Sequence, residues 1–445
     1  MQITARYWLV LLLASSAALR ADDLAGVYAV EGRSDKEGPY PGEARIEAGG
    51  GGPVLALRRG TAPEVRGMLS RSGTQFVLSV RLPGESEREL QAAYRPDSEG
   101  NLRGNWRVLE GATEVDRGEE ALLWFSGGKR AKVASGEARP RRVRVVVSVD
   151  WEGRNLAPED LQAIEDFRAA LPDVPLTHFL NAAYFTKPGA VSEELAARIR
   201  RALRDGDETG LHVHAWRSLV EAAGVGFRTG PTFWGDRQGL SEHEGDTGHE
   251  VELAAYEEPE LRRIVRTSVA ILSDQGFAIS RSFRAGGWIG APAVLAAVRA
   301  EGFWIDSSAT DAIWHDEVEG FPIRERIREI WPGVTKECAP FRIETPYGGI
   351  LEMPDTGALA DYTTATEIEE HLRSGLARLA ADPSRDIFVH AGFHVESASL
   401  YAERVLSAIR AVRRDSPDSV VFETLQTSAL AVRLSESIRG PPAPR

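Results

Sequence analysis

Two histidines separated by one residue lie in the stretch ETGLHVHAW, residues 208–216. On a β-strand, side chains two positions apart point to the same side of the sheet, so His212 and His214 can face one metal ion there. On a helix the same spacing would turn the two imidazoles apart. Such a pair also occurs as two half-buried strand histidines, so the stretch alone leaves a metal site and an ordinary strand both open.

A pair of carboxylates ends an apolar run earlier in the chain. In SVDWEG, residues 148–153, the alternation of a strand places Asp150 and Glu152 on the same side. Paired carboxylates can divide the work of a hydrolase, since one binds a cation while the other takes a proton from water. The alternative is that Asp150 caps the turn after the strand.

An arginine and a third acidic residue occupy similar positions. In SFRAGGWIG, residues 282–290, Arg284 precedes two glycines that let a ligand approach the backbone closely. Its guanidinium is predicted to hold a carboxylate, either that of Asp150 or that of a substrate, or else to form a structural ion pair. In WIDSSA, residues 304–309, Asp306 also stands where a strand should end.

Two histidines in FVHAGFHVE, residues 388–396, complete the series. We predict His390 at the end of a strand, with Asp306 close enough to fix its tautomer and raise its basicity, as a general acid requires. His394 lies just beyond and is either a substrate-binding residue or an ordinary loop residue.

Three further histidines receive a plainer interpretation. His371 is predicted on the polar face of a helix. His243 and His249 belong to the Gly-rich segment FWGDRQGLSEHEGDTGHE, residues 233–250. A segment of this length and composition is either a lid over the site or a solvated loop, and the solvated loop is the favoured interpretation.

The candidate residues share a position at the ends of predicted strands. VRVVVSVD is typical of a buried strand, and residues 192–206 are typical of a helix that Ser192 caps and Gly206 ends. Four more helices, each followed by a strand, are predicted at residues 259–274, 292–300, 366–381 and 400–413. Repeated β/α units form a parallel sheet, doubly wound or closed into a barrel, whose functional groups collect where the strands end. Five polar strand ends are hard to explain by packing, so we predict an active site there.

The first part of the chain has a different pattern. Residues 24–126 contain short alternating stretches such as QFVLSVRL and LRGNWRV, separated by Gly, Pro, Asp, Asn and Ser, which predict a small antiparallel β-sandwich or barrel. No histidine falls in this region, and we expect no catalytic role for it. Residues 127–141 mix basic residues with Gly, Pro and Ser and are predicted to be a linker rather than a polyanion-binding patch.

Composition limits the class of protein. The chain has 445 residues, of which 42% are hydrophobic, so it can bury a substantial core. Its net charge of −13 argues against a nucleic-acid partner, because phosphate binding requires concentrated Lys and Arg. Cys338 is the single cysteine, so internal disulfides are excluded.

The first 21 residues predict export. Arg6 precedes an apolar run, small residues precede Ala21, and the run is too short for an ordinary transmembrane helix. Residues 1–21 are therefore predicted to be a signal peptide. We expect a soluble periplasmic or secreted protein without stable membrane insertion after its removal, and an uncleaved signal anchor is the alternative.

Taken in order, these motifs resemble those of the polysaccharide deacetylase family, also called carbohydrate esterase 4 or the NodB homology group. The resemblance covers residues 143–434 and rests on the succession VDWE, ETGLHVH, FRAGGW, IDSS and FVH. It implies a distorted (β/α) barrel over residues 142–436 that uses a divalent metal, which we expect to be zinc. It also implies that the protein removes N-acetyl groups from a cell-envelope or extracellular polysaccharide. The alternatives are a metal-independent amidohydrolase that acts on another C–N bond and a non-catalytic glycan-binding protein.

The resemblance also implies roles for single residues. Asp150 resembles the general base, and Arg284 the arginine that orients it, while His390 with Asp306 resembles the general acid. For the metal, the resemblance implies Glu152 and His212. A second metal histidine usually lies four residues after the first, where this chain has Trp216, and His214 is expected to replace it. The residues expected to contact the sugar rings of an oligosaccharide or polysaccharide are Trp151, Trp216, Trp288 and His394.

Overall fold

The computed structural model describes residues 24–36, 38–47, 53–59, 63–72, 75–82, 88–96, 101–126, 141–235, 239–315, 322–416, 419–434 and 442. The chain divides into two compact units, residues 1–139 and 140–445. The predicted signal peptide and nearly all of the predicted linker lie outside the described residues. Within the described part, no helix is both long and apolar enough to cross a membrane.

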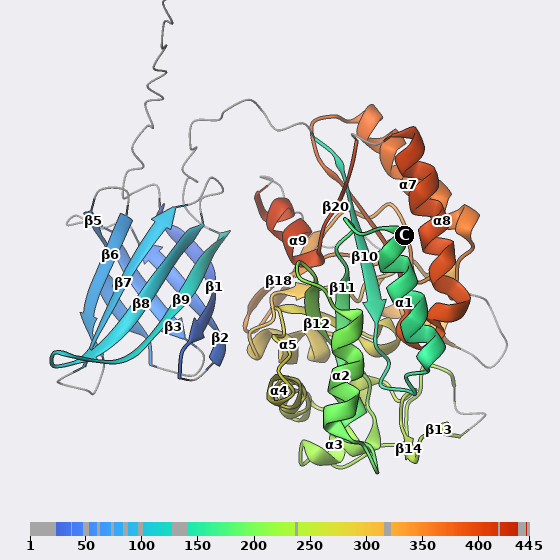
Figure 1. Cartoon of the computed structure of the whole chain (residues 1–445), viewed down its shortest axis with the longest axis horizontal. Helices are drawn as coiled ribbons and strands as arrows, with labels where there is room; N and C mark the ends of the chain where they lie inside the picture. Colours follow the sequence, from blue (N-terminus) through green and yellow to red (C-terminus); the bar gives the residue numbers. More distant parts are fainter. Residues whose placement is uncertain are drawn as a thin grey trace, which may run out of the picture. The chain divides into compact units, whose positions relative to one another are not determined.

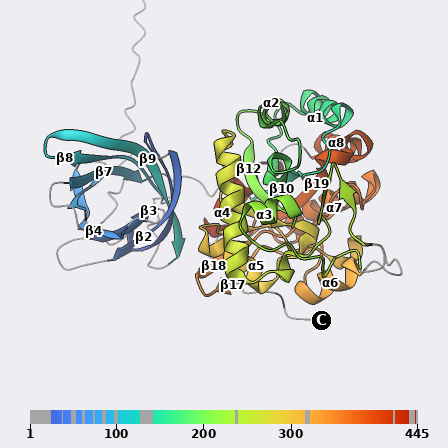
Figure 2. The same ribbon diagram turned by 90° about the horizontal axis from the view of Figure 1, so that it is seen from below.

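The first unit is an antiparallel β-barrel (Figures 1 and 2). Each strand pairs with the next one along the chain except β4 with β5, and the last strand pairs with the first. β4 and β5 are two halves of one stretch interrupted at Leu69, which completes the ring. The strands are β1 Gly26–Ser34, β2 Gly38–Glu47, β3 Val54–Arg59, β4 Val65–Met68, β5 Ser70–Ser72, β6 Gln75–Arg81, β7 Arg88–Pro96, β8 Leu102–Glu110 and β9 Thr113–Ser126.

Alternating burial explains this barrel. In β7, Leu90, Ala92 and Tyr94 are buried while the residues between them are partly exposed, as the period of two predicts. Buried side chains of this kind form a hydrophobic core of the unit. Among the two predicted architectures, sandwich and barrel, the structure has the barrel.

The second unit is built on a curved, largely parallel sheet in the order β17-β18-β16-β15-β12-β11-β10-β19. β10 is buried on both faces, which explains why its sequence is a continuous apolar run without alternation. β17 runs antiparallel to β18, and β20 pairs with the start of β10. The strands are β10 Val143–Asp150, β11 Thr177–Asn181, β12 Glu208–Val213, β15 Ser282–Ala285, β16 Ile305–Asp306, β17 Phe341–Thr345, β18 Gly348–Glu352, β19 Ile387–His394 and β20 Val420–Phe422.

The segment after β18 closes this sheet into a distorted barrel. Asp355 bridges to Thr310, which follows β16, and Leu359 bridges to Gly392 in β19. The segment lies tight against β19, since a Cβ on Gly357 would come within 2.1 Å of the carbonyl oxygen of His390. The second unit is thus an α/β structure in which a short extended segment takes the place of a full strand.

Helices cover the outside of the barrel (Figure 1). They follow the predicted β/α alternation closely, but three details of the prediction were wrong. The helix that begins at Ser192 ends at Ala202, before the predicted end at Gly206. α2 begins at Ser192, with Val191 as its N-cap, so the Ser192 side chain does not cap it. His371 is buried, because α7 packs against β19 and α8, and its Nε2 lies 3.0 Å from Thr356 Oγ1. The helices are α1 Pro158–Ala170, α2 Ser192–Ala202, α3 Arg217–Ala222, α4 Glu258–Asp274, α5 Pro292–Ala300, α6 Ile323–Ile330, α7 Ala365–Ala381, α8 Ala398–Asp415 and α9 Leu425–Leu434.

Strand register brings the candidate residues to one edge of the barrel. Asp150 at the end of β10 lies opposite His394 at the end of β19. In the neighbouring strands, His212 of β12 lies opposite Arg284 of β15. Since parallel strands end on the same side, these side chains meet at the carboxyl edge of the sheet.

Candidate active site

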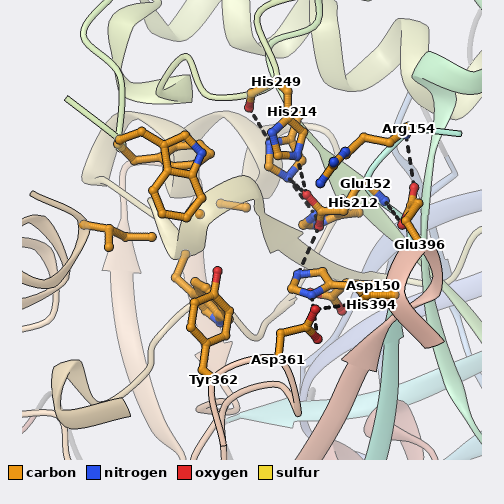
Figure 3. A pocket seen from close by; sticks show the side chains of 17 residues that line it. Asp150, Glu152, Arg154, His212, His214, His249, Asp361, Tyr362, His394 and Glu396 are labelled. Carbon is orange, nitrogen blue, oxygen red and sulfur yellow. Dashed lines mark hydrogen bonds and ion pairs between the residues drawn. The ribbon is translucent and has the colours of Figure 1, made fainter. Parts of the chain in front are cut away.

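A small pocket opens at this edge, with a volume of about 140 Å³ (Figure 3). One part of its wall is polar and includes Asp150, Glu152, His212, His214, His249 and His394. Another part is largely aromatic and includes Phe233, Trp234, Trp288, Ile323 and Tyr362. A cavity of about this size can hold one ring-sized group, so the pocket suits a small acyl group better than a whole oligosaccharide.

Three imidazoles converge on the carboxylate of Glu152 (Figure 3). His212 Nε2 lies 3.1 Å from Glu152 Oε1. His214 Nε2 and His249 Nε2 lie 2.9 Å and 2.5 Å from Oε2. The Nε2 atoms of His212 and His214 are themselves only 3.1 Å apart. All of these residues are buried, so little water competes for the converging atoms.

Backbone carbonyls fix the tautomers of two of these histidines. His212 Nδ1 lies 2.9 Å from the carbonyl oxygen of Arg284, and His214 Nδ1 lies 2.6 Å from that of His249. A carbonyl oxygen only accepts, so both Nδ1 atoms must donate a hydrogen. In the neutral imidazoles both Nε2 atoms then present lone pairs to each other and to the carboxylate. Electron-pair donors packed this way repel one another unless a cation or additional protons lie between them.

A divalent cation fits this donor set. Zinc takes imidazole nitrogen and carboxylate oxygen at about 2.0 to 2.2 Å. One ligand atom each of Glu152, His214 and His249 lies within 4.8 Å of the others, a spread that one ion can bridge. His212 Nε2 adjoins this group, 3.1 Å from both Glu152 Oε1 and His214 Nε2. In a metal-binding imidazole, the ring nitrogen that does not bind the metal usually donates its N–H to a carbonyl or carboxylate, as Nδ1 of His212 and His214 does here. Burial, and then the neighbouring His214, lower the pKa of His249 to about 3, which keeps this imidazole neutral and able to bind an ion. Glu152, His212, His214 and His249 can therefore hold a metal.

His249 was missed in the sequence, where its segment was interpreted as a solvated loop. The structure turns this segment back at Gly248, whose φ is +101° and whose added Cβ would lie 2.6 Å from the carbonyl oxygen of Ala215. This close approach stacks the His249 ring on His214, with centroids 4.1 Å apart. The sequence signal was the glycine directly before the histidine in an otherwise polar segment.

Asp150 lines the pocket and is held by Arg284. Arg284 Nη1 donates to Asp150 Oδ1 at 2.9 Å, so of the two carboxylates considered for it, the guanidinium binds the protein's own. Arg284 is 1% exposed and is therefore out of reach of a substrate. The pairing leaves Asp150 Oδ2 as the oxygen without this contact.

The remaining donors of Arg284 extend across the barrel. Nε donates to the carbonyl oxygen of Ser307 and Nη2 to its hydroxyl, both at 2.9 Å. Nη1 also donates to Ser148 Oγ at 2.9 Å, and Nη2 lies 3.1 Å from His390 Nε2. With Asp150 these contacts use all five N–H groups of a guanidinium, so the buried charge is fully paired.

His390 does not reach the pocket, and Asp306 is not its partner. His390 is fully buried beneath Arg284, and its Nδ1 lies 2.5 Å from Asp355 Oδ1. Asp306 lies opposite Glu352 in the register of β16 and β18, so its carboxyl group meets that of Glu352 instead. Burial raises the pKa of both carboxyls, which lets the pair share a proton. The prediction that His390 is a general acid supported by Asp306 is therefore wrong, because His390 does not line the pocket and Asp306 does not contact it.

Ser148, His390 and Asp355 repeat the order of a serine-hydrolase triad, since His390 Nε2 lies 2.9 Å from Ser148 Oγ. None of the three lines the pocket, and Ser148 is fully buried. Its hydroxyl also accepts a hydrogen bond from Arg284. This arrangement is structural, because a substrate has no access to the hydroxyl.

His394 occupies the place expected for a general acid. It lies at the end of β19, its Nδ1 is 3.0 Å from Asp361 Oδ2, and its Nε2 is 3.4 Å from Glu152 Oε1 (Figure 3). Burial lowers the pKa of His394, but the charges of Asp361 and Glu152 outweigh it and raise this pKa to about 10. The structure thus replaces the predicted pair His390 and Asp306 by His394 and Asp361 at the pocket.

Of the three tryptophans predicted to contact sugar rings, only Trp288 lines the pocket. Trp151 and Trp216 are fully buried and do not line the pocket, so their predicted contact with sugars is wrong. Trp151 Nε1 lies 3.1 Å from His178 Nδ1, and Trp216 Nε1 donates to the carbonyl oxygen of Glu152 at 2.9 Å. Trp216 therefore supports the loop that carries Glu152. Trp288 does line the pocket, as predicted.

The pairing of Arg284 predicts a large effect on stability. Arg284→Lys should lower the free energy of unfolding by about 3 kcal/mol or more, because a single ammonium cannot serve all these acceptors and leaves buried groups unpaired. As a matched control, Arg413→Lys alters an arginine that binds Asp173 at the surface and should change it by less than about 1 kcal/mol. Urea unfolding measures both, and similar losses in the two variants would contradict the prediction.

Comparisons with known proteins found a likeness to solved structures. No family model and no curated protein matches the chain. A solved structure assigned as a polysaccharide deacetylase from Mycobacterium smegmatis is 15% identical, covers 70% of this chain and 97% of its own, and gives a TM-score of 0.44. One with the same assignment from Pseudomonas aeruginosa PAO1 is 12% identical, covers 68% and 97%, and gives 0.39. A family 4 carbohydrate esterase from Streptomyces lividans, in complex with acetate, is 9% identical, covers 64% and 92%, and gives 0.31. The chain is thus similar to solved structures of deacetylases and carbohydrate esterases.

Proposed function

We propose that this protein is a metal-dependent hydrolase that removes N-acetyl groups from a polysaccharide. The observation that carries the proposal is the convergence of lone pairs from Glu152, His212 and His214 in one pocket, which the carboxylate of Asp150 and the imidazole of His394 also line. The small pocket volume supports an acetyl group, and the order of motifs in the sequence supports a carbohydrate amide.

The metal would be held by Glu152, His212, His214 and His249, and nitrogen and oxygen donors of this kind suit zinc. When bound, such an ion would polarise the acyl carbonyl and lower the pKa of water. The protein contributes the orientation of these donors, since backbone carbonyls hold His212 and His214 in the required tautomer.

Asp150 is the general base of the proposed reaction. Its carboxylate takes a proton from the water whose oxygen attacks the acyl carbon. Arg284 fixes the orientation of this carboxylate through Oδ1, because the guanidinium is itself immobilised by four further contacts.

His394 is the general acid. As the C–N bond breaks, it gives its proton to the departing amine nitrogen, and acetate is the second product. Asp361 holds His394 Nδ1 at 3.0 Å, which orients the ring with Nε2 toward the polar side of the pocket. Because Asp150 and His394 lie on neighbouring strands in register, the base and the acid are fixed relative to each other.

We predict that the protein binds one divalent ion per chain and that His249→Ala weakens binding by at least about 10- to 100-fold, as expected for the loss of a ligand or its support. Glu242→Ala is the matched control, since Glu242 is an exposed residue of the same segment and does not line the pocket. It should leave affinity unchanged. Metal analysis and chelator competition measure the effect, and wild-type protein that binds no divalent ion would favour a metal-independent amidohydrolase.

We also predict that zinc- or cobalt-loaded protein releases acetate from N-acetylglucosamine oligomers. Asp150→Asn and His394→Gln should each lower kcat by roughly 10²- to 10⁴-fold, as loss of a general base or acid does. Both variants should keep the metal content of the wild type. Release of acetate at the wild-type rate by Asp150→Asn would reject the mechanism, and release by neither wild type nor variants would reject the substrate class.

Export is part of the proposal, supported by the pattern of residues 1–21. A polysaccharide substrate of the envelope or outside the cell requires a periplasmic or secreted enzyme. Expression of the full chain should yield a mature form that begins near residue 22 in the extracytoplasmic fraction, as mass spectrometry would show. Full-length protein retained in membranes would instead indicate a signal anchor.

A further inference from the structure

Arg154 brings a positive charge to the pocket that no acidic side chain of the described chain neutralises. It is exposed, lines the pocket and follows Glu152 by two residues. Figure 3 shows its side chain pointing toward the cluster of Glu152 and the histidines. Among the described residues its guanidinium forms no ion pair, unlike the buried Arg284.

The loop that presents Arg154 is held in place. Glu396 accepts hydrogen bonds from the backbone N–H of Arg154 at 3.0 Å and from that of Glu152 at 3.2 Å. Tyr184 donates its hydroxyl to the same carboxylate. Gly153 between them has φ +79°, and a Cβ there would lie 2.9 Å from Trp216 Nε1. A side chain that starts from so fixed a backbone loses less freedom when it binds a ligand.

The carboxylates of the pocket are already engaged. Asp150 is held by Arg284, Glu152 by the histidines, and Asp361 by His394. Glu396 accepts the loop N–H groups described above. These are the four acidic side chains among the residues that line the pocket. The charge of Arg154 is therefore available to a ligand.

We propose that Arg154 binds an anionic group of the substrate, so that the preferred substrate is an acidic N-acetylated sugar. This inference rests on the proposed function and deepens it. The planar guanidinium binds two oxygens of a carboxylate or phosphate at once, a geometry that a neutral hydroxyl does not match. The aromatic wall with Trp288 and Tyr362 offers an apolar surface for the sugar ring while Arg154 takes its charge.

Binding of matched ligands tests this without turnover. Calorimetry of the metal-loaded full chain should compare N-acetylmuramic acid with its uncharged methyl ester, and N-acetylglucosamine 6-phosphate with N-acetylglucosamine. Every protein compared carries Asp150→Asn, so that the ligands are bound and not turned over. The protein with the wild-type Arg154 should bind at least one of the two acids about 10-fold or more tightly than its neutral partner, and the better pair identifies a carboxylate or a phosphate. The preference should fall as salt is raised.

Arg154→Gln should bring the acid-to-neutral ratio close to 1, while Arg154→Lys keeps part of it because the charge remains without the fork. Arg263→Gln, an exposed arginine of α4 outside the pocket, should leave the ratio unchanged. Equal binding of both acids and their neutral partners by the protein with the wild-type Arg154 would overturn the proposal. So would Arg154→Gln weakening acid and neutral ligand alike, since Arg154 would then contact a part common to both.

The two levels of inference fail separately. An Arg154-dependent preference for acids without acetate release would keep this proposal and reject the deacetylase. Acetate release with no preference for acids would reject this proposal alone.

Discussion

One buried guanidinium joins the active end of the barrel. Arg284 is almost fully excluded from water, and a buried charge is tolerated only when its donors are paired with good geometry. Its partners come from β10, β19 and the segment after β16, so these parts of the chain must all be in register before the charge is satisfied. The position of Asp150 follows from this requirement.

The polar side chains beneath the pocket form two layers with different tasks. In the lower layer, His390 and Asp355 complete the surroundings of Arg284, and no substrate reaches them. In the upper layer, His394 and Asp361 repeat a histidine–carboxylate pair at the surface of the pocket. The first pair stabilises the orientation of Asp150 through Arg284, whereas the second pair lies where a ligand in the pocket can contact it.

Much of the fold was predictable because its periodicities are local. The β/α alternation and the antiparallel first unit are confirmed, as are the polar ends of β10, β12, β15 and β16 and the pairing of Arg284 with Asp150. The choice between His390 and His394 depended on where β19 ends, and a strand that continues by four residues moves the pocket to the second histidine. His249 was not predictable from periodicity, since a turn at Gly248 and contacts distant in sequence place it.

The origin of His249 in a loop has a consequence for how the second unit holds together. Glu152 directly follows β10, and His212 and His214 lie at the end of β12. His249 belongs to a loop and is 97 residues from Glu152 in the sequence. An ion bound by both would close a long loop of the chain and remove much of its freedom when unfolded. In a chain with a single cysteine, the cluster would thus supply the kind of cross-link that a disulfide supplies elsewhere.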